Sequence, residues 1–115
     1  MMYGSVTPVY LAAGATDMRK SVDGLALIVS ESFRLDPFSK ALFVFCNRSR
    51  NRVKILEWEQ TGFWLHYKRL EKGVFKWPCG DGAKPVSERE LRWLLDGLDI
   101  GRTHGHKAVE ERLMI

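Results

Sequence analysis

A chain of 115 residues with 45% hydrophobic and 28% charged side chains has the size and composition of one globular domain with a buried core. Its formal net charge of +4 favours anionic partners. No apolar run approaches the ~20 residues of a membrane span, and residues 1–10 do not form a signal peptide. Two distant cysteines, Cys46 and Cys79, argue against a zinc site or a disulfide scaffold. We therefore expect a cytoplasmic protein with one domain over residues 1–100 and a flexible polar tail over residues 101–115.

The first predicted elements are a short strand and an amphipathic helix. The residues Val9–Ala12 favour a strand, and Thr16 and Asp17 favour a turn and a helix cap. Asp36 and Pro37 end the helix, because the residue before a proline is disfavoured in the α region. Between the two, apolar residues recur with helical spacing at Met18, Val22, Leu25, Val29 and Phe33.

Four further strands are predicted between residues 42 and 77. Apolar, aromatic and alternating residues indicate strands at Leu42–Cys46, Arg52–Trp58, Phe63–Lys68 and Val74–Trp77. The connectors between them are too short for the crossover that a parallel pair requires. The sequence therefore predicts an α+β fold, in which an antiparallel β-meander of about four to five strands packs against the first helix.

A loop and a second helix are predicted after the meander. Residues 78–85 are rich in glycine and proline and are expected to form the loop. Ser87 and Glu90 have the spacing of a capping box, in which each side chain bonds the backbone N–H of the other residue. A short C-terminal helix is predicted from the apolar residues that follow at helical spacing, which are Leu91, Leu94, Leu95 and Leu98.

The positive charge of the chain is concentrated in the predicted sheet. Between residues 42 and 77, eight basic and three acidic side chains give +5, against +4 for the whole chain. Aligned by their apolar sides, the strands place on one face Val53, Ile55, Phe63, Leu65, Tyr67, Phe75 and Trp77. The other face then holds Arg52, Lys54, Trp64, His66, Lys68 and Lys76, with Leu56 and Trp58 further along. Basic residues interleaved with tryptophan are typical of a sheet that contacts nucleic acid, although a solvated face or a face under a helix has the same composition.

A basic tip is predicted at the first hairpin turn. Arg48, Arg50 and Arg52 lie in and beside this turn, where neutral neighbours do not shield them, and arginine forms bidentate bonds with phosphates. We expect these side chains to bury little surface, and a turn that only keeps the sheet soluble is the alternative. The full set of predicted nucleic-acid contacts is Arg19, Lys20, Arg48, Arg50, Arg52, Lys54, His66, Lys68, Arg69, Lys72 and Lys76.

Signals of catalysis and metal binding are weak. Asp17 and Asp23 are separated by a spacing that places them on different sides of a helix, and no serine or cysteine has a base partner in the sequence. His104 and His106 lack a third ligand on a rigid element. Gly14 precedes a helix start, where free amides bind phosphate, but it belongs to no nucleotide motif. We therefore predict no enzymatic activity, no catalytic residue, no cofactor and no metal.

Several blocks of the sequence resemble a family of proteins from mobile DNA. These blocks are Thr16–Ala26, Leu42–Arg48, Val53–Leu56 and Gly62–Pro78. They are similar to the Orf2-like (TnpB) accessory proteins of the IS66 group of bacterial insertion sequences, over roughly residues 9–100. Glu57 departs from this pattern, since an aromatic or apolar residue is expected there. The resemblance implies a role in transposition beside a separate, larger transposase that carries the catalytic acids, and it implies no catalytic residue in this chain.

Three functions are consistent with the sequence. The first is a non-catalytic accessory protein that binds DNA through the basic hairpin and the sheet face. The second is an adaptor that docks on the transposase through anchors such as Trp58, Trp64 and Arg69. The third is a small metal-dependent nuclease. DNA binding differs from the adaptor function in its steep salt dependence, because binding to phosphates releases counterions.

Overall fold

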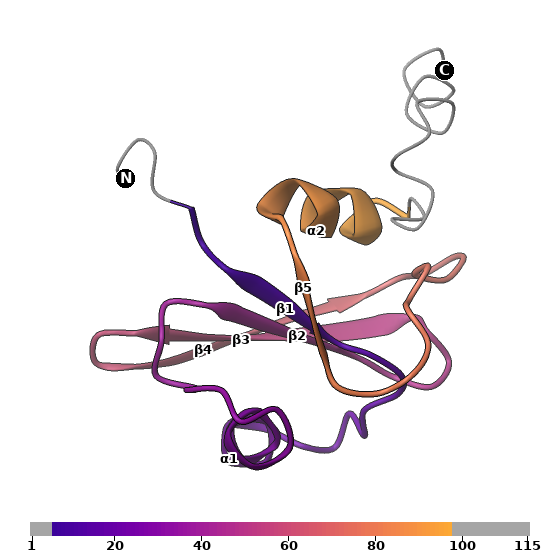
Figure 1. Ribbon diagram of the computed structural model, residues 1–115. Helices are drawn as coiled ribbons and strands as arrows, with labels where there is room; N and C mark the ends of the chain where they lie inside the picture. The colour runs from indigo at the N-terminus through magenta and orange to yellow at the C-terminus, as the bar shows by residue number, and fades with distance from the viewer. Residues whose placement is uncertain (1–5, 98–115) are drawn as a thin grey trace.

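The structure is a computed structural model and describes residues 6–97. Five strands form one sheet in the order β4-β3-β2-β1-β5, and the two α-helices lie on opposite sides of it (Figure 1). The α+β class is therefore confirmed, while the predicted tail over residues 101–115 lies outside the described residues. The elements are β1 (Val9–Ala12), α1 (Val22–Leu27), the π-helical segment η1 (Ile28–Ser32), β2 (Leu42–Cys46), β3 (Arg52–Glu59), β4 (Gly62–Arg69), β5 (Ala83–Val86) and α2 (Glu88–Leu95). None of the helices within residues 6–97 has the length and apolar content needed to cross a membrane.

Strands β2, β3 and β4 form the antiparallel meander that the sequence predicts. Val44 lies opposite Ile55, and Leu56 lies opposite Leu65. Each strand follows the previous one after a short turn, and a short turn returns the chain in the antiparallel direction. Alternation and turn residues thus located these three strands to within one residue at each end.

The sheet as a whole is mixed, which corrects the prediction of a wholly antiparallel sheet. β1 runs parallel to β2, with Val9 opposite Leu42 and Leu11 opposite Val44. The chain that joins these strands contains α1 and η1 and is long enough for the crossover of a parallel pair. The short connectors that indicate antiparallel pairing all follow residue 42, so they carry no information about β1.

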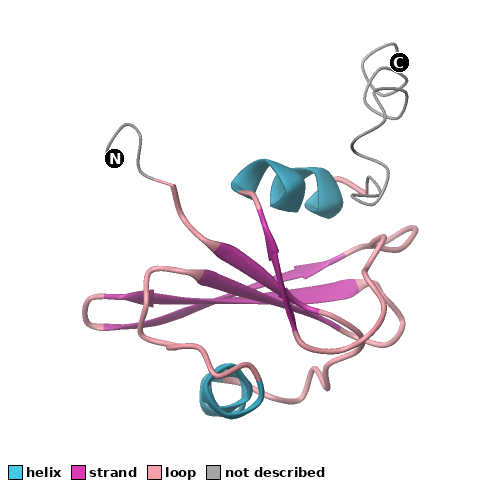
Figure 2. Ribbon diagram, in the orientation of Figure 1, coloured by secondary structure: helices cyan, strands magenta, loops and turns pink. Residues whose placement is uncertain are grey.

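The strand predicted at Val74–Trp77 is wrong, because this segment belongs to the long loop between β4 and β5 (Figure 2). Its alternation reflects burial: Phe75 and Trp77 are buried, and the residues between and before them are exposed. The Phe75 N–H donates to the carbonyl oxygen of Arg50 at 2.7 Å, and the Trp77 indole N–H donates to that of Ala12 at 2.8 Å. The segment is therefore an extended loop that contributes two aromatic rings to the core.

The fifth strand, β5, lies where the sequence predicts a loop. It pairs antiparallel with β1, and Tyr10 lies opposite Pro85. Proline lacks a backbone N–H, so it is accepted in a sheet almost only on an edge strand. β5 is the edge beside β1, and its four residues are too few for a clear periodic signal.

Apolar side chains fill both sides of the sheet. On the side covered by α1, here called the α1 face, Leu25 and Val29 pack with Phe43, Phe45 and Leu56. On the opposite side, the α2 face, the core contains Val44, Val53, Phe75, Trp77, Leu91 and Leu94. Because β2 is covered on both faces, its sequence is a continuous apolar run and does not alternate.

The apolar stripe predicted for the first helix is confirmed, but the helix begins later than predicted. Leu25 and Val29 at the centre of the stripe are fully buried, and the other stripe residues pack partly against the same core. α1 begins after Ser21, whose side chain makes no capping hydrogen bond. Thr16 and Asp17 lie too far upstream to cap it.

The capping box predicted for the second helix is confirmed. The Glu90 N–H donates to Ser87 Oγ at 2.9 Å, and the Ser87 N–H donates to Glu90 Oε1 at 2.9 Å. Leu91 and Leu94 are buried against the sheet, as their spacing predicts. Leu98, the last residue of the predicted stripe, lies outside the described residues.

Phe75→Ala is expected to destabilise the protein strongly, although the residue lies in a loop. Removing a fully buried phenylalanine loses its burial energy and leaves a cavity, which lowers the free energy of unfolding by about 3–5 kcal/mol. Val74→Ala shortens its exposed neighbour and is the matched control, with an expected change within about 0.5 kcal/mol. Urea unfolding followed by tryptophan fluorescence measures both. Equal stability of the two variants would contradict the burial of Phe75.

Candidate nucleic-acid interface

The predicted basic face is divided between the two sides of the sheet. β3 and β4 pair with Lys54 opposite Tyr67 and Ile55 opposite His66. Residues directly opposite one another in an antiparallel pair share a face. Of the predicted basic face, the α1 face therefore holds Arg52 and Lys54, and the α2 face holds Trp64, His66 and Lys68. The predicted alignment of β4 is wrong by one residue, since a slip of one residue exchanges the faces of a strand.

The predicted apolar face is divided by the same register. Val53 and Ile55 face α2, whereas Phe63, Leu65 and Tyr67 face α1. The sequence predicts Tyr67 on the apolar face, but the register places it among basic side chains. The position of Tyr67 follows only from the register, because the alternation of β4 groups Tyr67 with the apolar residues Phe63 and Leu65.

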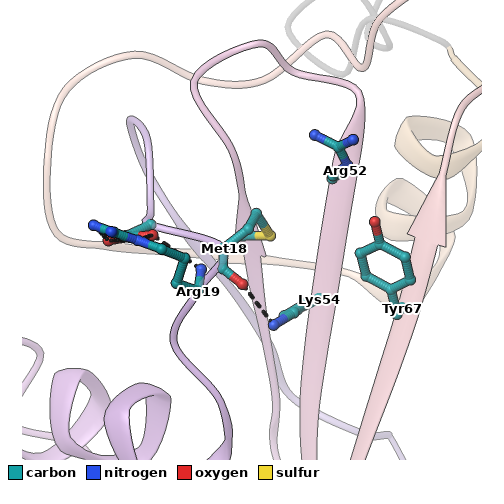
Figure 3. Close-up of a pocket in the computed structure, with 6 residues that line it drawn as sticks. Met18, Arg19, Arg52, Lys54 and Tyr67 are labelled. Atoms are coloured by element: carbon teal, nitrogen blue, oxygen red, sulfur yellow. Dashed lines mark hydrogen bonds and ion pairs between the residues drawn. The ribbon is translucent and has the colours of Figure 1, made fainter.

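An open cleft of about 640 Å³ lies on the α1 face, where β3 and β4 meet the segment before α1 (Figure 3). We call it the basic cleft, and it is lined by Asp17, Met18, Arg19, Arg52, Lys54 and Tyr67. Three of these side chains are positive and one is negative, so the cleft carries a net charge of +2 at neutral pH. The structure thus brings together two predicted contacts from β3 and one from a segment more than thirty residues earlier in the chain.

Lys54 holds the two walls of the basic cleft together. Its ammonium group donates to the carbonyl oxygen of Met18 at 2.7 Å and to that of Lys20 at 2.8 Å. These bonds attach the segment before α1 to the middle of β3. They use two of the three N–H groups of the ammonium and do not neutralise its charge, so Lys54 is both a structural link and a source of positive potential.

Asp17 and Arg19 form an exposed pair at the rim of the basic cleft. The Arg19 guanidinium binds both carboxylate oxygens of Asp17, with a shortest N–O distance of 2.7 Å. The Arg19 backbone N–H also donates to this carboxylate at 2.9 Å. The hydrogen bonds from the Arg19 side chain, followed by that from its backbone, hold the pKa of Asp17 well below its usual range. Asp17 is therefore ionised at neutral pH, and it neutralises Arg19 while leaving part of the guanidinium fork exposed.

Arg52 and Tyr67 are the groups of the basic cleft that remain available for a ligand. Within residues 6–97, the Arg52 guanidinium has no hydrogen bond and no ion-pair partner. Tyr67 is 54% exposed and lies on the neighbouring strand (Figure 3). A guanidinium can bind a phosphate with two parallel hydrogen bonds, and an exposed aromatic ring can stack on a nucleobase.

The predicted basic tip is only partly available to a ligand. Arg48 is exposed, but the Arg50 guanidinium donates to the carbonyl oxygen of Trp77 at 2.7 Å. The Asn47 side-chain oxygen accepts the backbone N–H groups of Asn51 and Arg52 at 3.0 Å each, which closes the turn. The expectation that all three turn arginines bury little therefore holds only for Arg48, because Arg50 and Arg52 are half-buried. Arg50 fastens the turn to the loop that carries Phe75 and Trp77.

A second group of basic side chains lies on the α2 face. Lys68, Lys72 and Lys76 line an open cleft of about 550 Å³ next to the C-terminal end of α2. The Lys68 ammonium donates to the carbonyl oxygen of Leu95 at 3.2 Å, where the negative end of the helix dipole favours a cation. Asp96 lines the same cleft and offsets one of the three charges. This group is therefore a weaker candidate for binding phosphate.

Two further predicted contacts lie next to carboxylates. The guanidinium of Arg69 lies 2.9 Å from Glu71, and His66 Nε2 lies 2.9 Å from Glu57 Oε1. These pairs are exposed, so they add little to stability, but they lower the positive potential nearby. Lys20, the remaining predicted contact, is exposed next to the basic cleft.

The other candidate sites do not assemble within the described part of the chain, and His104 and His106 lie outside it. Within residues 6–97, no three side chains of the histidine, cysteine, aspartate or glutamate type lie close enough to hold a metal ion. The Gly14 N–H donates to the carbonyl oxygen of Pro78 at 3.0 Å and is not free for a phosphate. A Cβ at Gly14 would lie 2.6 Å from the carbonyl oxygen of Gly80, so the residue serves close packing of two loops. Burial raises the pKa of the Cys46 thiol to about 11, which leaves it protonated and unreactive at neutral pH.

Comparison with known proteins identifies relatives along most of the chain. The family described as "IS66 Orf2 like protein" matches residues 7–105. Uncharacterized protein y4hO of Sinorhizobium fredii (strain NBRC 101917 / NGR234) is 40% identical over 97 residues, which cover 84% of this chain and 84% of that protein. Uncharacterized protein y4jC of the same strain is 33% identical over 95 residues, which cover 82% and 81%. No solved structure matches the chain.

The neighbouring arginines of the turn are expected to respond differently to substitution. Arg50→Ala removes a charged hydrogen bond to the Trp77 carbonyl and is expected to lower the free energy of unfolding by about 1.5–3 kcal/mol. Arg48→Ala is the matched control, and its exposed side chain predicts a change within about 0.5 kcal/mol. Chemical denaturation of both variants measures the difference. A wild-type midpoint for Arg50→Ala would rule out a structural role for this arginine.

Proposed function

The chain belongs to the IS66 Orf2-like family, and from this premise we propose that it is a non-catalytic accessory protein of insertion-sequence transposition that binds DNA. The membership confirms the resemblance seen in the sequence and makes the chain an insertion-sequence-associated accessory protein. The proposed contacts are the basic cleft on the α1 face and the exposed Arg48 beside it. The transposase of the same element is the proposed partner, and it is expected to supply the catalytic groups.

The observation that carries this proposal is the open, net positive basic cleft on the α1 face. Arg52 has no competing partner within residues 6–97, and Lys54 keeps its charge while anchoring the wall. Arg48 extends the positive surface beyond the start of β3. A short basic track with one freely available guanidinium favours contact with a phosphate backbone, which needs charge and no particular base.

The absence of catalysis is proposed from the same geometry. Asp17 is engaged by the Arg19 side chain, and Asp23 lies within α1, away from the lining of the basic cleft. Metal-assisted cleavage of a phosphodiester requires carboxylates that converge on a cation. The described acids do not converge, so the nuclease alternative has no support from a particular group of residues.

Removing two positive charges at the proposed contacts is expected to weaken DNA binding and its salt dependence. In Arg48→Ala/Arg52→Ala, two lost phosphate contacts would reduce the slope of log affinity against log salt by roughly 1.8, at about 0.9 per contact on duplex DNA. Arg50 is kept because it supports the fold. Fluorescence anisotropy with a mixed-sequence duplex at several salt concentrations measures the slope.

The matched control is Lys84→Ala/Arg89→Ala, which has the same net charge. Lys84 lies on β5 at the opposite edge of the sheet, and Arg89 lies on α2 against Trp93. This variant is expected to keep most of the wild-type slope. Equal loss of slope in both variants would show that net charge alone governs binding, and an unchanged slope in the first would exclude the basic cleft.

A second function, docking on a protein partner, is favoured by an aromatic cluster at the other end of β3. Phe38, Trp58 and Phe63 pack with ring centroids 5.0–5.4 Å apart, and Phe38 is 56% exposed. We call these three residues the aromatic patch. Large exposed aromatic groups are frequent anchors of protein interfaces. Of the predicted anchors, Trp58 belongs to this patch, whereas Trp64 lies on the α2 face and Arg69 is paired with Glu71.

Phe38→Ser tests whether the aromatic patch binds the transposase of the same element. Loss of an aromatic anchor is expected to weaken that complex about tenfold, measured by calorimetry with the purified transposase. DNA affinity should stay unchanged, because the patch contains no basic side chain. Val74→Ser removes another exposed apolar residue outside the patch and serves as the control. Wild-type affinity of Phe38→Ser would exclude the patch as an anchor.

A further inference from the structure

Tyr67 presents an aromatic ring on the open edge of the sheet. β4 is the outermost strand on its side of the five-stranded sheet, and Tyr67 is 54% exposed on it. The ring lies on the α1 face, opposite Lys54 of β3 (Figure 3). An exposed aromatic ring leaves apolar surface in contact with water. Where charged groups that can bind a ligand surround such a ring, the ring indicates a binding site.

The charges around Tyr67 are those that bind phosphate. Lys54 is its direct neighbour across the strand pair, and Arg52 is its diagonal neighbour two residues along β3. Diagonal neighbours in an antiparallel pair are roughly 7–8 Å apart, a distance that one extended nucleotide bridges. A ring for stacking and a free guanidinium within reach of the same nucleotide are the two components of single-strand recognition.

Trp64 provides an internal comparison, because it is equally exposed on the same strand but on the α2 face. It is 56% exposed, and its indole N–H donates to Glu59 Oε1 at 2.6 Å. Its ring stacks beside His66, which is paired with Glu57. Carboxylates at this position repel phosphate. Of the two exposed rings of β4, only Tyr67 is therefore suited to a nucleic acid.

We propose that the basic cleft holds an unpaired nucleotide of DNA, with its base stacked on Tyr67 and its phosphate on Arg52. This inference rests on the proposed DNA binding and adds that the site selects single-stranded over double-stranded DNA. In a duplex, the faces of the bases are stacked on one another, and only base edges and phosphates are accessible. Tyr67 therefore contributes to the binding of single strands and does not contribute to the binding of duplexes.

The test compares a labelled oligothymidylate with a mixed-sequence duplex of the same length, using the full chain. Tyr67→Thr removes the ring but keeps a residue suited to a strand, and it is expected to weaken oligothymidylate binding about tenfold with no change for the duplex. Tyr67→Phe keeps the ring and is expected to bind as the wild type does. Trp64→Thr is the matched control on the opposite face and is expected to have no effect on either ligand.

Circular dichroism and urea unfolding identify any variant that loses its fold. If Tyr67→Thr does so, Tyr67→Val, which also removes the ring and suits a strand, replaces it with the same expected result. Duplex binding that persists in Tyr67→Thr, together with unchanged oligothymidylate binding, would overturn the inference and leave the proposed DNA binding intact. Absence of binding to both ligands at low salt would overturn both proposals. Loss of transposase binding in Tyr67→Thr with unchanged DNA binding would reassign the ring to a protein interface.

Discussion

The register of β3 against β4 determines the chemistry of both faces of this protein. Leu56 lies opposite Leu65 beneath α1, while Val53 and Ile55 pack on the side of α2. A slip of one residue would move the whole set of β4 side chains to the opposite face, so burial of the leucines fixes the pairing. The same pairing places Tyr67 beside Lys54. The position of the candidate site is therefore a consequence of hydrophobic packing on the strand that carries it.

Local sequence signals predicted the elements of the fold well, because they act over a few residues. Local periodicity or side-chain bonding accounts for three features, which are the stripe centred on Leu25 and Val29, the capping box at Ser87 and the three strands of the meander. The errors concern choices that depend on distant partners. Alternation at residues 74–77 correctly indicated which rings are buried, but it cannot distinguish a paired strand from an extended loop packed on the core.

The candidate site was predictable in composition and not in arrangement. Positive charge between residues 42 and 77 marked the right part of the chain, yet the contacts separate into groups once the faces are assigned. Arg50 illustrates the reason, since its nearest partner is the carbonyl oxygen of Trp77, twenty-seven residues away. No local sequence pattern distinguishes Arg50, which bonds within the protein, from the exposed Arg48 of the same turn. That distinction arises only when the loop bearing Phe75 folds back over the turn.

The two candidate contact regions lie at opposite ends of β3 on the same face. Arg52 and Lys54 lie near the start of the strand, and Trp58 is its next-to-last residue. Arg52 and Trp58 are therefore separated by roughly 20 Å at about 3.3 Å per residue. A protein partner at the aromatic patch and a nucleic acid at the basic cleft would therefore not compete for surface. If both proposed contacts form, the pairing of β3 and β4 would set the distance between the DNA strand and the docked protein.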